Sequence, residues 1–212
     1  MGARDVVAGS YRLNGSKPVA YIDETYNLDD RWAKFYVMTA VVVQADQRDL
    51  VRRALIARAG CGYWHTSEAL RSSEGRRRAH DLLDYLGHPE GSEFCVIAHA
   101  RAIEEHDTDG EQARAGCLTQ ILSRLSALED SVELFLLERR RGRRQSNQDA
   151  QTKTDAVRAG HVPRHAQLLQ LSPGDEPLLW LPDLVCSAYR RQLTADDATL
   201  FCYIDHICQV LP

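Results

Sequence analysis

Three acidic residues stand next to apolar segments in a way that predicts a metal site. Asp23 and Glu138 each close an apolar run, and Asp183 precedes one. If the two runs are neighbouring parallel strands, both carboxylates lie beyond the carboxyl ends of the strands, where open α/β sheets bind ligands. Converging carboxylates cannot all stay ionised without a cation, and their oxygens suit Mg²⁺ or Mn²⁺. We therefore predict that Asp23, Glu138 and Asp183 hold divalent ions, which would activate a hydroxide to cleave a phosphodiester bond.

Two of these acids also have a structural explanation, and both explanations stay open at this point. Asp183 follows Pro182 and fits the start of a helix, where it would cap the chain. Glu138 fits a solvated strand end paired with Arg139 or Arg140. The three acids taken together favour a site.

The densest charge cluster of the chain directly follows the second of these acids. It holds Arg139, Arg140, Arg141, Arg143 and Arg144. Beside an acidic site, these side chains would bind the phosphates of a polyanionic substrate and steer it toward the metal ions. A solvated loop that balances neighbouring acids is the alternative explanation.

Other titratable residues are candidates to assist the site. Glu24 directly follows the first acid, and His65 lies three residues before Glu68. Glu24 or Glu68 would assist catalysis, and His65 would add a ligand, a substrate contact or a proton shuttle. A solvated surface pair explains His65 and Glu68 equally well. His161 and His165 straddle a proline, so they form only a weak zinc signal.

The elements that must position these residues follow from the hydrophobic pattern. Apolar and β-branched segments predict strands at 19–22, 35–43, 94–102, 131–138 and 165–171, and amphipathic spacing predicts helices between the later ones. The first two strands are expected to pair as a hairpin, after which strands and helices alternate. This order predicts a single-domain α/β protein, a three-layer sandwich with a mixed sheet.

The two ends of the chain are expected to depart from this pattern. Residues 1–17 are polar and contain Gly and Ser, so they predict a loose lead-in to a domain that spans 18–212. Near the other end, helices are predicted at 181–193 and 196–210. The apolar segment 200–211 could pack on the sheet or on a second copy, so the oligomeric state stays open and a homodimer is one option.

Length and composition bound the class of protein. A chain of 212 residues with 44% hydrophobic and 26% charged residues fits one globular domain and argues against disorder. Its net charge of -4 argues against a protein that coats nucleic acid through overall charge. There is no apolar signal-peptide core near the first residues and no apolar run of about 20 residues. The six cysteines form no C-x-x-C pair. We therefore expect a cytoplasmic protein with reduced thiols and no membrane partner.

Three segments resemble an uncharacterised bacterial family, the domain of unknown function numbered thirty-eight hundred, in a version common in actinobacteria. They read Y-I-D-E-T at 21–25, L-E-R-R at 137–140 with the downstream Asn147 and Asp149, and E-P-L-L-W-L-P-D-L-V at 176–185. The last segment is the most specific, and the resemblance covers about residues 18–193.

The resemblance implies a ribonuclease-H-like fold with a metal-dependent, nuclease-type site. By position, Asp23 would be the first-strand acid, Glu138 the acid that closes a later strand, and Asp183 the acid on the last helix. Glu138 stands where Asp is usual in such sites. The candidates for a fourth acid are Glu24, Glu68 and Asp149.

Together, the residues and the resemblance predict a divalent-metal-dependent nuclease that hydrolyses phosphodiester bonds of DNA or RNA. Two alternatives remain open. One is a non-catalytic nucleic-acid-binding or protein-binding module of the same fold, and the other is a phosphohydrolase of small molecules that uses the same acids.

Overall fold

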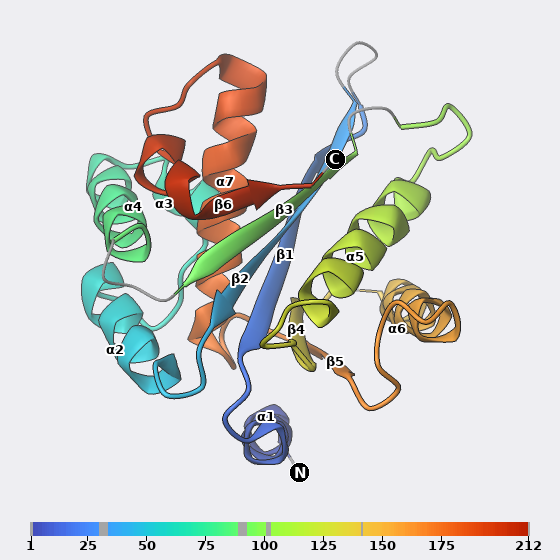
Figure 1. Cartoon of the computed structure of the whole chain (residues 1–212). Helices are drawn as coiled ribbons and strands as arrows, with labels where there is room; N and C mark the ends of the chain where they lie inside the picture. The colour runs from blue at the N-terminus through green and yellow to red at the C-terminus, as the bar shows by residue number, and fades with distance from the viewer. Residues whose placement is uncertain (1, 30–33, 89–92, 101–102, 141, 212) are drawn as a thin grey trace.

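A computed structural model describes residues 2–29, 34–88, 93–100, 103–140 and 142–211 of the chain. One six-stranded sheet lies between two layers of helices (Figure 1). Helices α5 and α6 cover one face of the sheet, and α2, α4 and α7 cover the other (Figure 1). The prediction of an α/β fold with a mixed sheet is confirmed, and the layers are compatible with a three-layer sandwich.

The helices and strands alternate along most of the chain, as their amphipathic and apolar patterns predict. The strands are β1 Val19–Asn27, β2 Phe35–Val43, β3 Phe94–Ala100, β4 Leu134–Glu138, β5 Gln167–Leu171 and β6 Cys208–Val210. The α-helices are α1 Ala3–Asn14, α2 Arg48–Ala59, α3 Thr66–Ala69, α4 Ser73–Leu86, α5 Glu111–Ser126, α6 Arg143–Arg158 and α7 Trp180–Ala195. Short 3-10 turns are η1 Pro177–Leu179, η2 Phe201–Tyr203 and η3 Asp205–Ile207.

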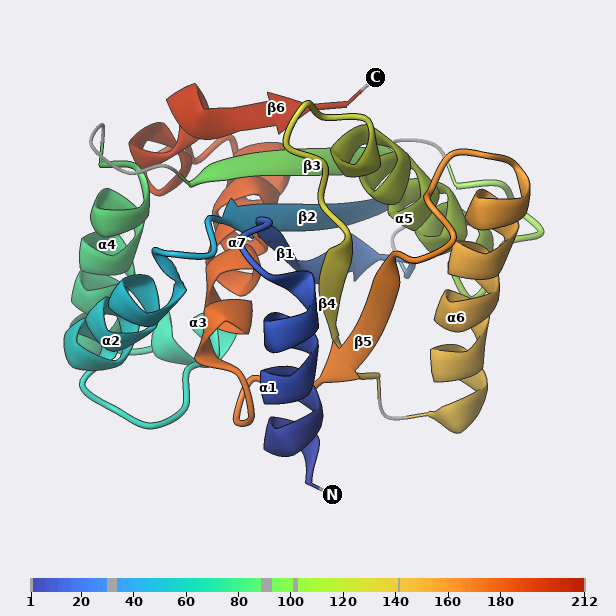
Figure 2. The same ribbon diagram turned by 60° about the horizontal axis from the view of Figure 1, so that its bottom comes forward.

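The sheet order places the end of β4 beside the middle of β1. The strands lie in the order β5-β4-β1-β2-β3-β6 (Figure 2). β2 is antiparallel to both of its neighbours, whereas β1 and β4, β4 and β5, and β3 and β6 pair in parallel. Ile22 of β1 is in register with Leu137 of β4. The sequence predicts a first strand that ends at Ile22, but β1 continues to Asn27, so Asp23 lies in the middle of its strand and does not end it. Glu138 ends β4 and comes next to Asp23, because the two strands are parallel neighbours.

Alternation along the strands divides the apolar residues between two cores. Tyr21 of β1 packs in the core under α2, α4 and α7, where Trp180 is fully buried. Ile22 points to the opposite face and packs in the core under α5, with Leu118 and Ile121. Since successive side chains of a strand point to opposite faces, this alternation also decides where the acids after Ile22 point.

The predicted loose lead-in at 1–17 is wrong, because most of it forms helix α1. Val7 is buried in the core under α7, so the polar composition conceals an amphipathic helix. The Tyr11 hydroxyl donates to Glu176 Oε2 at 2.8 Å and shares a hydrogen bond with the Tyr21 hydroxyl at 2.8 Å. These contacts attach α1 to the sheet near β4 (Figure 2).

Replacing Tyr11 by phenylalanine should lower the free energy of unfolding by about 1–3 kcal/mol, because the Tyr21 hydroxyl and the Glu176 carboxylate each lose a buried partner. Urea denaturation monitored by circular dichroism measures the change. Tyr26→Phe, at an exposed position, is the control and should stay within about 0.5 kcal/mol of the parent. Equal stabilities of the two variants would show that the Tyr11 hydroxyl does not hold α1.

The helix predicted at 196–210 is also wrong. The segment forms η2, η3 and the short edge strand β6, which pairs with β3 through Cys95 and Cys208. Leu200, Phe201 and Ile204 are buried in the core, so these apolar residues pack on the chain's own sheet, whereas Val210 is exposed. Pairing with β3 supplies hydrogen bonds that a helix would otherwise make internally.

No helix in the described residues is long and apolar enough to cross a membrane.

Candidate active site

A cleft of about 780 Å³ opens along the second half of β1 and at the carboxyl end of β4. Acidic and basic side chains from different parts of the chain share its walls. The acids are Asp23, Glu24, Glu138 and Asp183, and the arginines are Arg139, Arg140, Arg190 and Arg191. His65, Ser67 and Gln145 add further polar groups.

Three of these acids come from three elements on the α7 side of the sheet. Asp23 of β1 follows Ile22, which faces the α5 core, so strand alternation turns Asp23 toward α7. Glu138 is its neighbour on β4, and Asp183 lies in the first turn of α7. The structure thus brings the three predicted acids to one cleft. Asp23 is buried, although it belongs to a polar residue type.

The structural explanations considered for two of these acids do not apply. Asp183 caps no residue of its own helix; its Oδ2 accepts a hydrogen bond from the backbone N–H of Thr66 at 2.7 Å, at the start of α3. Arg140 pairs with Glu111, and the guanidinium of Arg139 donates to the carbonyl oxygen of Gln170 at 3.0 and 3.3 Å. Within the described ranges, neither arginine pairs with Glu138.

Burial and mutual repulsion raise the pKa values of this acidic cluster. The pKa of Asp23 lies well above its ordinary value, first because of burial and then because of nearby carboxylates, of which Glu138 has the largest effect. Burial and the charge of Asp183 raise the pKa of Glu138 to about 7, against a lowering effect of His65 and of a hydrogen bond with Asp23. Burial also raises the pKa of Asp183, while the hydrogen bond from Thr66 and the charge of His65 oppose the rise. The carboxyl groups of Asp23 and Glu138 therefore lie close enough to other acids of the cleft for those acids to oppose their ionisation.

We expect the stability of the metal-free protein to fall as Glu138 ionises. A carboxyl whose pKa is raised in the folded state binds more protons there than in the unfolded chain. Its contribution to stability is therefore fully present below about pH 4.5 and is lost as the pH rises through about 7. Urea denaturation in EDTA across this pH window measures the slope, that is, how steeply the free energy of unfolding changes with pH. Glu138→Gln should make the slope shallower, and an unchanged slope would contradict the raised pKa.

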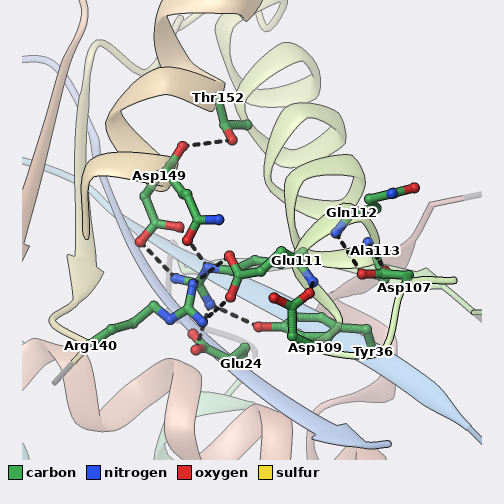
Figure 3. A network of polar contacts seen from close by, with 12 residues as sticks. Glu24, Tyr36, Asp107, Asp109, Glu111, Gln112, Ala113, Arg140, Asp149 and Thr152 are labelled. Atoms are coloured by element: carbon green, nitrogen blue, oxygen red, sulfur yellow. Dashed lines mark hydrogen bonds and ion pairs between the residues drawn. The ribbon is translucent and has the colours of Figure 1, made fainter. Parts of the chain in front are cut away.

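Glu24 points to the other face of the sheet, where it joins a buried ion-pair network. Its Oε1 lies 2.5 Å from Nη1 of Arg114, a fully buried residue of α5. The Arg114 guanidinium also donates to both oxygens of Asp149 at 2.6 and 3.0 Å and to the Tyr36 hydroxyl at 2.9 Å. Glu24, Tyr36 and Asp149, labelled in Figure 3, come from β1, β2 and α6, and all three contact the Arg114 guanidinium. Asp149 is therefore bound to an arginine on the far side of the sheet from Asp23.

Glu24 still reaches the cleft, because it also lines the cleft wall. Its Oε2 is buried without a hydrogen-bond partner in the described part of the chain. Burial raises the pKa of Glu24, and the charge of Arg114 opposes that rise. Glu24 is thus placed between the Arg114 network and the acids, whereas the other two candidates for a fourth acid are not.

His65 and Glu68 have different surroundings despite their close spacing. His65 lines the cleft, and its charge lowers the pKa values of Glu138 and Asp183. Its Nδ1 lies 3.1 Å from the Ser67 hydroxyl. Glu68 is exposed on α3 and lines an adjoining depression together with His65, so the structure does not bring Glu68 among the acids.

The predicted arginine cluster divides between the cleft and the surface. Arg139 and Arg140 line the cleft. Arg143 and Arg144 are exposed in the first turn of α6, which begins inside the segment predicted as a loop, and neither lines the cleft. Arg141 lies outside the described residues.

Helix α7 supplies cleft residues that the sequence reasoning missed. Ser187, Arg190 and Arg191 follow Asp183 by four, seven and eight positions, which is the spacing of one helix face. Arg190 Nη1 donates to the Thr25 hydroxyl at 3.1 Å, and Arg191 pairs with Asp197 at 2.5 Å. Helical periodicity counted from Asp183 would have identified them.

The donor chemistry of the cleft suits a hard divalent cation, since carboxylate oxygens are its preferred ligands. In the side-chain positions of the described residues, however, no three His, Cys, Asp or Glu groups stand close enough to hold one ion. Asp23, Glu138 and Asp183 are thus within electrostatic range of one another without forming a finished coordination shell.

Comparison with known proteins yields no relative: no family model matches the chain, and no curated protein is significantly similar to it. The resemblance to the bacterial family therefore stays a prediction.

Proposed function

We propose that this chain is a divalent-metal-dependent hydrolase of phosphodiester bonds in nucleic acid. The observation that carries the proposal is the meeting of Asp23, Glu138 and Asp183 in one cleft that also contains arginines. Burying like charges together is costly, and a bound cation would remove that cost. A site with both acids and arginines suits a substrate whose phosphates bridge metal ions and basic side chains.

We also propose the ribonuclease-H-like architecture that the family resemblance implies. The sheet starts with an antiparallel pair and continues with parallel strands. The acids lie on the first strand, on a later parallel strand and on the last long helix, as the resemblance requires. These positions support the assignment.

The residues of the cleft have separate roles in this proposal. Asp23, Glu138 and Asp183 would hold Mg²⁺ or Mn²⁺. Such ions activate water and neutralise charge on a phosphodiester. Arg139 and Arg190 orient the phosphates, since neither pairs with a carboxylate within the described ranges.

Other groups keep the acids in place. The Thr66 N–H holds the Asp183 carboxylate in one orientation, and His65 supplies a titratable group beside Glu138. Because the pKa of Glu138 is about 7, a cation would compete with a proton for this carboxylate near neutral pH.

A cleavage assay with the parent protein tests the proposal. Labelled single-stranded and duplex DNA and RNA are incubated with Mg²⁺, with Mn²⁺ or with EDTA, and products are resolved by length. We expect cleavage that requires the metal and returns when excess metal follows EDTA. Absence of cleavage on all four substrates at millimolar metal would contradict the proposal.

One observation favours a second candidate, a non-catalytic nucleic-acid-binding module of the same architecture. In the described residues, no three of the acids lie close enough together to bind one metal ion. Calorimetric titration with Mn²⁺ separates the two candidates. Binding that disappears in Glu138→Gln supports the hydrolase, and no binding at millimolar metal supports the module.

A further inference from the structure

Exposed aromatic side chains are confined to the surroundings of the acidic cleft. Among the Phe, Tyr and Trp residues that the structure describes, only Tyr26 and Tyr63 are exposed, at 49% and 51%. Tyr26 lines the cleft itself. Tyr63 lines the adjoining depression, which shares His65 with the cleft. Exposing two large rings at one site needs a reason, since most aromatic area is buried in folding.

The ring of Tyr26 stacks on a buried aromatic residue, and about half of the Tyr26 surface stays exposed, at 49%. The stacking partner is Tyr36, with 5.3 Å between ring centroids and an interplanar angle of 11°. Tyr36 is itself buried, and its hydroxyl accepts from Arg114. The buried network therefore supports a flat ring that is partly exposed in the cleft.

Positive charge lies beside these rings. Arg139 and Arg190 are exposed in the cleft, and within the described ranges neither pairs with a carboxylate. Flat rings next to basic groups can stack unpaired bases while the arginines contact the backbone phosphates. A duplex cannot use the rings in this way, because its bases are already stacked inside the helix.

We propose that the cleft binds single-stranded nucleic acid, with bases stacked on Tyr26 and Tyr63 and phosphates on Arg139 and Arg190. This substrate class rests on the proposed function, since the same cleft would carry out the hydrolysis. It excludes an intact duplex as the preferred ligand.

Fluorescence anisotropy in EDTA tests binding apart from catalysis. The probes are labelled oligothymidylate and oligouridylate of about 12 nucleotides and a DNA duplex of the same length. We expect both single strands to bind at least about tenfold more tightly than the duplex. The oligothymidylate and oligouridylate arms distinguish DNA from RNA as the better ligand.

Variants of the two rings separate stacking from other effects. Tyr26→Ala and Tyr63→Ala should each raise the Kd for a single strand by about tenfold, which corresponds to the loss of one stacked base. Tyr26→Phe and Tyr63→Phe keep the rings and should stay within about twofold of the parent. Leu50→Ala, at an exposed apolar position of α2 outside the cleft, is the control for a general loss of surface area.

Three outcomes would overturn this substrate class: no binding of single strands, equal binding of the duplex, or alanine variants that bind like the parent. The cleavage assay decides the proposed function independently. If the rings control binding but no metal-dependent cleavage occurs, the single-strand surface stands and the hydrolase proposal falls. If metal-dependent cleavage occurs but the rings do not affect binding, the hydrolase proposal stands and the stacking surface falls.

Discussion

Replacing Asp23 by asparagine should abolish metal-dependent cleavage while making the metal-free protein more stable. Replacing a residue that hydrogen-bonds to a metal ligand commonly lowers metal affinity or activity by about 10- to 100-fold. Replacing a ligand itself should therefore lower the cleavage rate by about 100-fold or more. At the same time, the variant removes a buried carboxyl group whose ionisation is opposed by burial and by the neighbouring Glu138. We therefore expect a higher Tm at pH 8 in EDTA, measured by differential scanning calorimetry.

The two effects together distinguish a functional acid from a structural one. Mn²⁺ should raise the Tm of the parent, because an ion that binds only the folded state stabilises it, and it should raise that of Asp23→Asn much less. The matched control is Asp46→Asn, at an exposed acid in the turn before α2, which should change neither quantity. Cleavage by Asp23→Asn within tenfold of the parent rate would remove Asp23 from the site, and a lower Tm would show that its charge stabilises the fold.

Replacing Arg114 by methionine should cause the largest loss of stability among the changes considered. The substitution leaves Glu24 and Asp149 buried without their cation and the Tyr36 hydroxyl without its donor. Breaking a buried ion pair by removing one partner costs about 3–5 kcal/mol. In a chain of this size, each kcal/mol lowers the Tm by about 2–4 °C. Guanidinium denaturation and calorimetry measure both quantities.

Two further variants keep this prediction decisive. Arg158→Gln breaks an exposed pair with Asp155 and should cost less than about 1 kcal/mol. Arg114→Lys retains the charge but cannot donate to both Asp149 oxygens as a fork, so we expect an intermediate loss and a folded protein. If Arg114→Lys and Arg158→Gln are equally stable, the network around Arg114 does not hold α6 against the sheet.

The acids on the two faces of the sheet are therefore expected to affect stability in opposite directions. On the α5 face, Glu24 is neutralised by Arg114, and this pairing stabilises the fold. On the α7 face, Asp23 and Glu138 repel each other, and this repulsion is tolerated at a cost in stability. Adjacent residues of one strand thus have opposite energetic effects, which is typical of functional sites.

Much of the fold follows from local pattern. The β-rich run 35–43 forms β2, and every one of its residues is buried. The amphipathic segment that ends before Gly87 forms α4. Asp23 and Glu138 could be predicted to lie near each other because they follow matching apolar runs of parallel neighbours, although β1 continues past Asp23 to Asn27. Periodicity and the chemistry of strand ends are local properties, so the amino-acid order alone contains them.

Other features needed contacts between residues far apart in the chain. The segment 208–210 is too short to show a strand pattern, and its conformation depends on the open edge of β3. Likewise, Ala3–Asn14 forms a helix that is attached to the fold because Tyr11 finds partners in Tyr21 and Glu176. Tertiary contacts overrode weak local preferences at both ends.

The sequence by itself determined which residues could do chemistry, namely acids at strand ends with arginines nearby. Only the tertiary structure decided their partners: Asp183 with the Thr66 N–H, Asp149 with Arg114, and Arg190 beside the cleft. Residue type and spacing define the charge and direction of a side chain along its own element. The partner of each charged side chain depends on how the helices pack on the two faces of the sheet. That packing is set by the apolar residues of both cores.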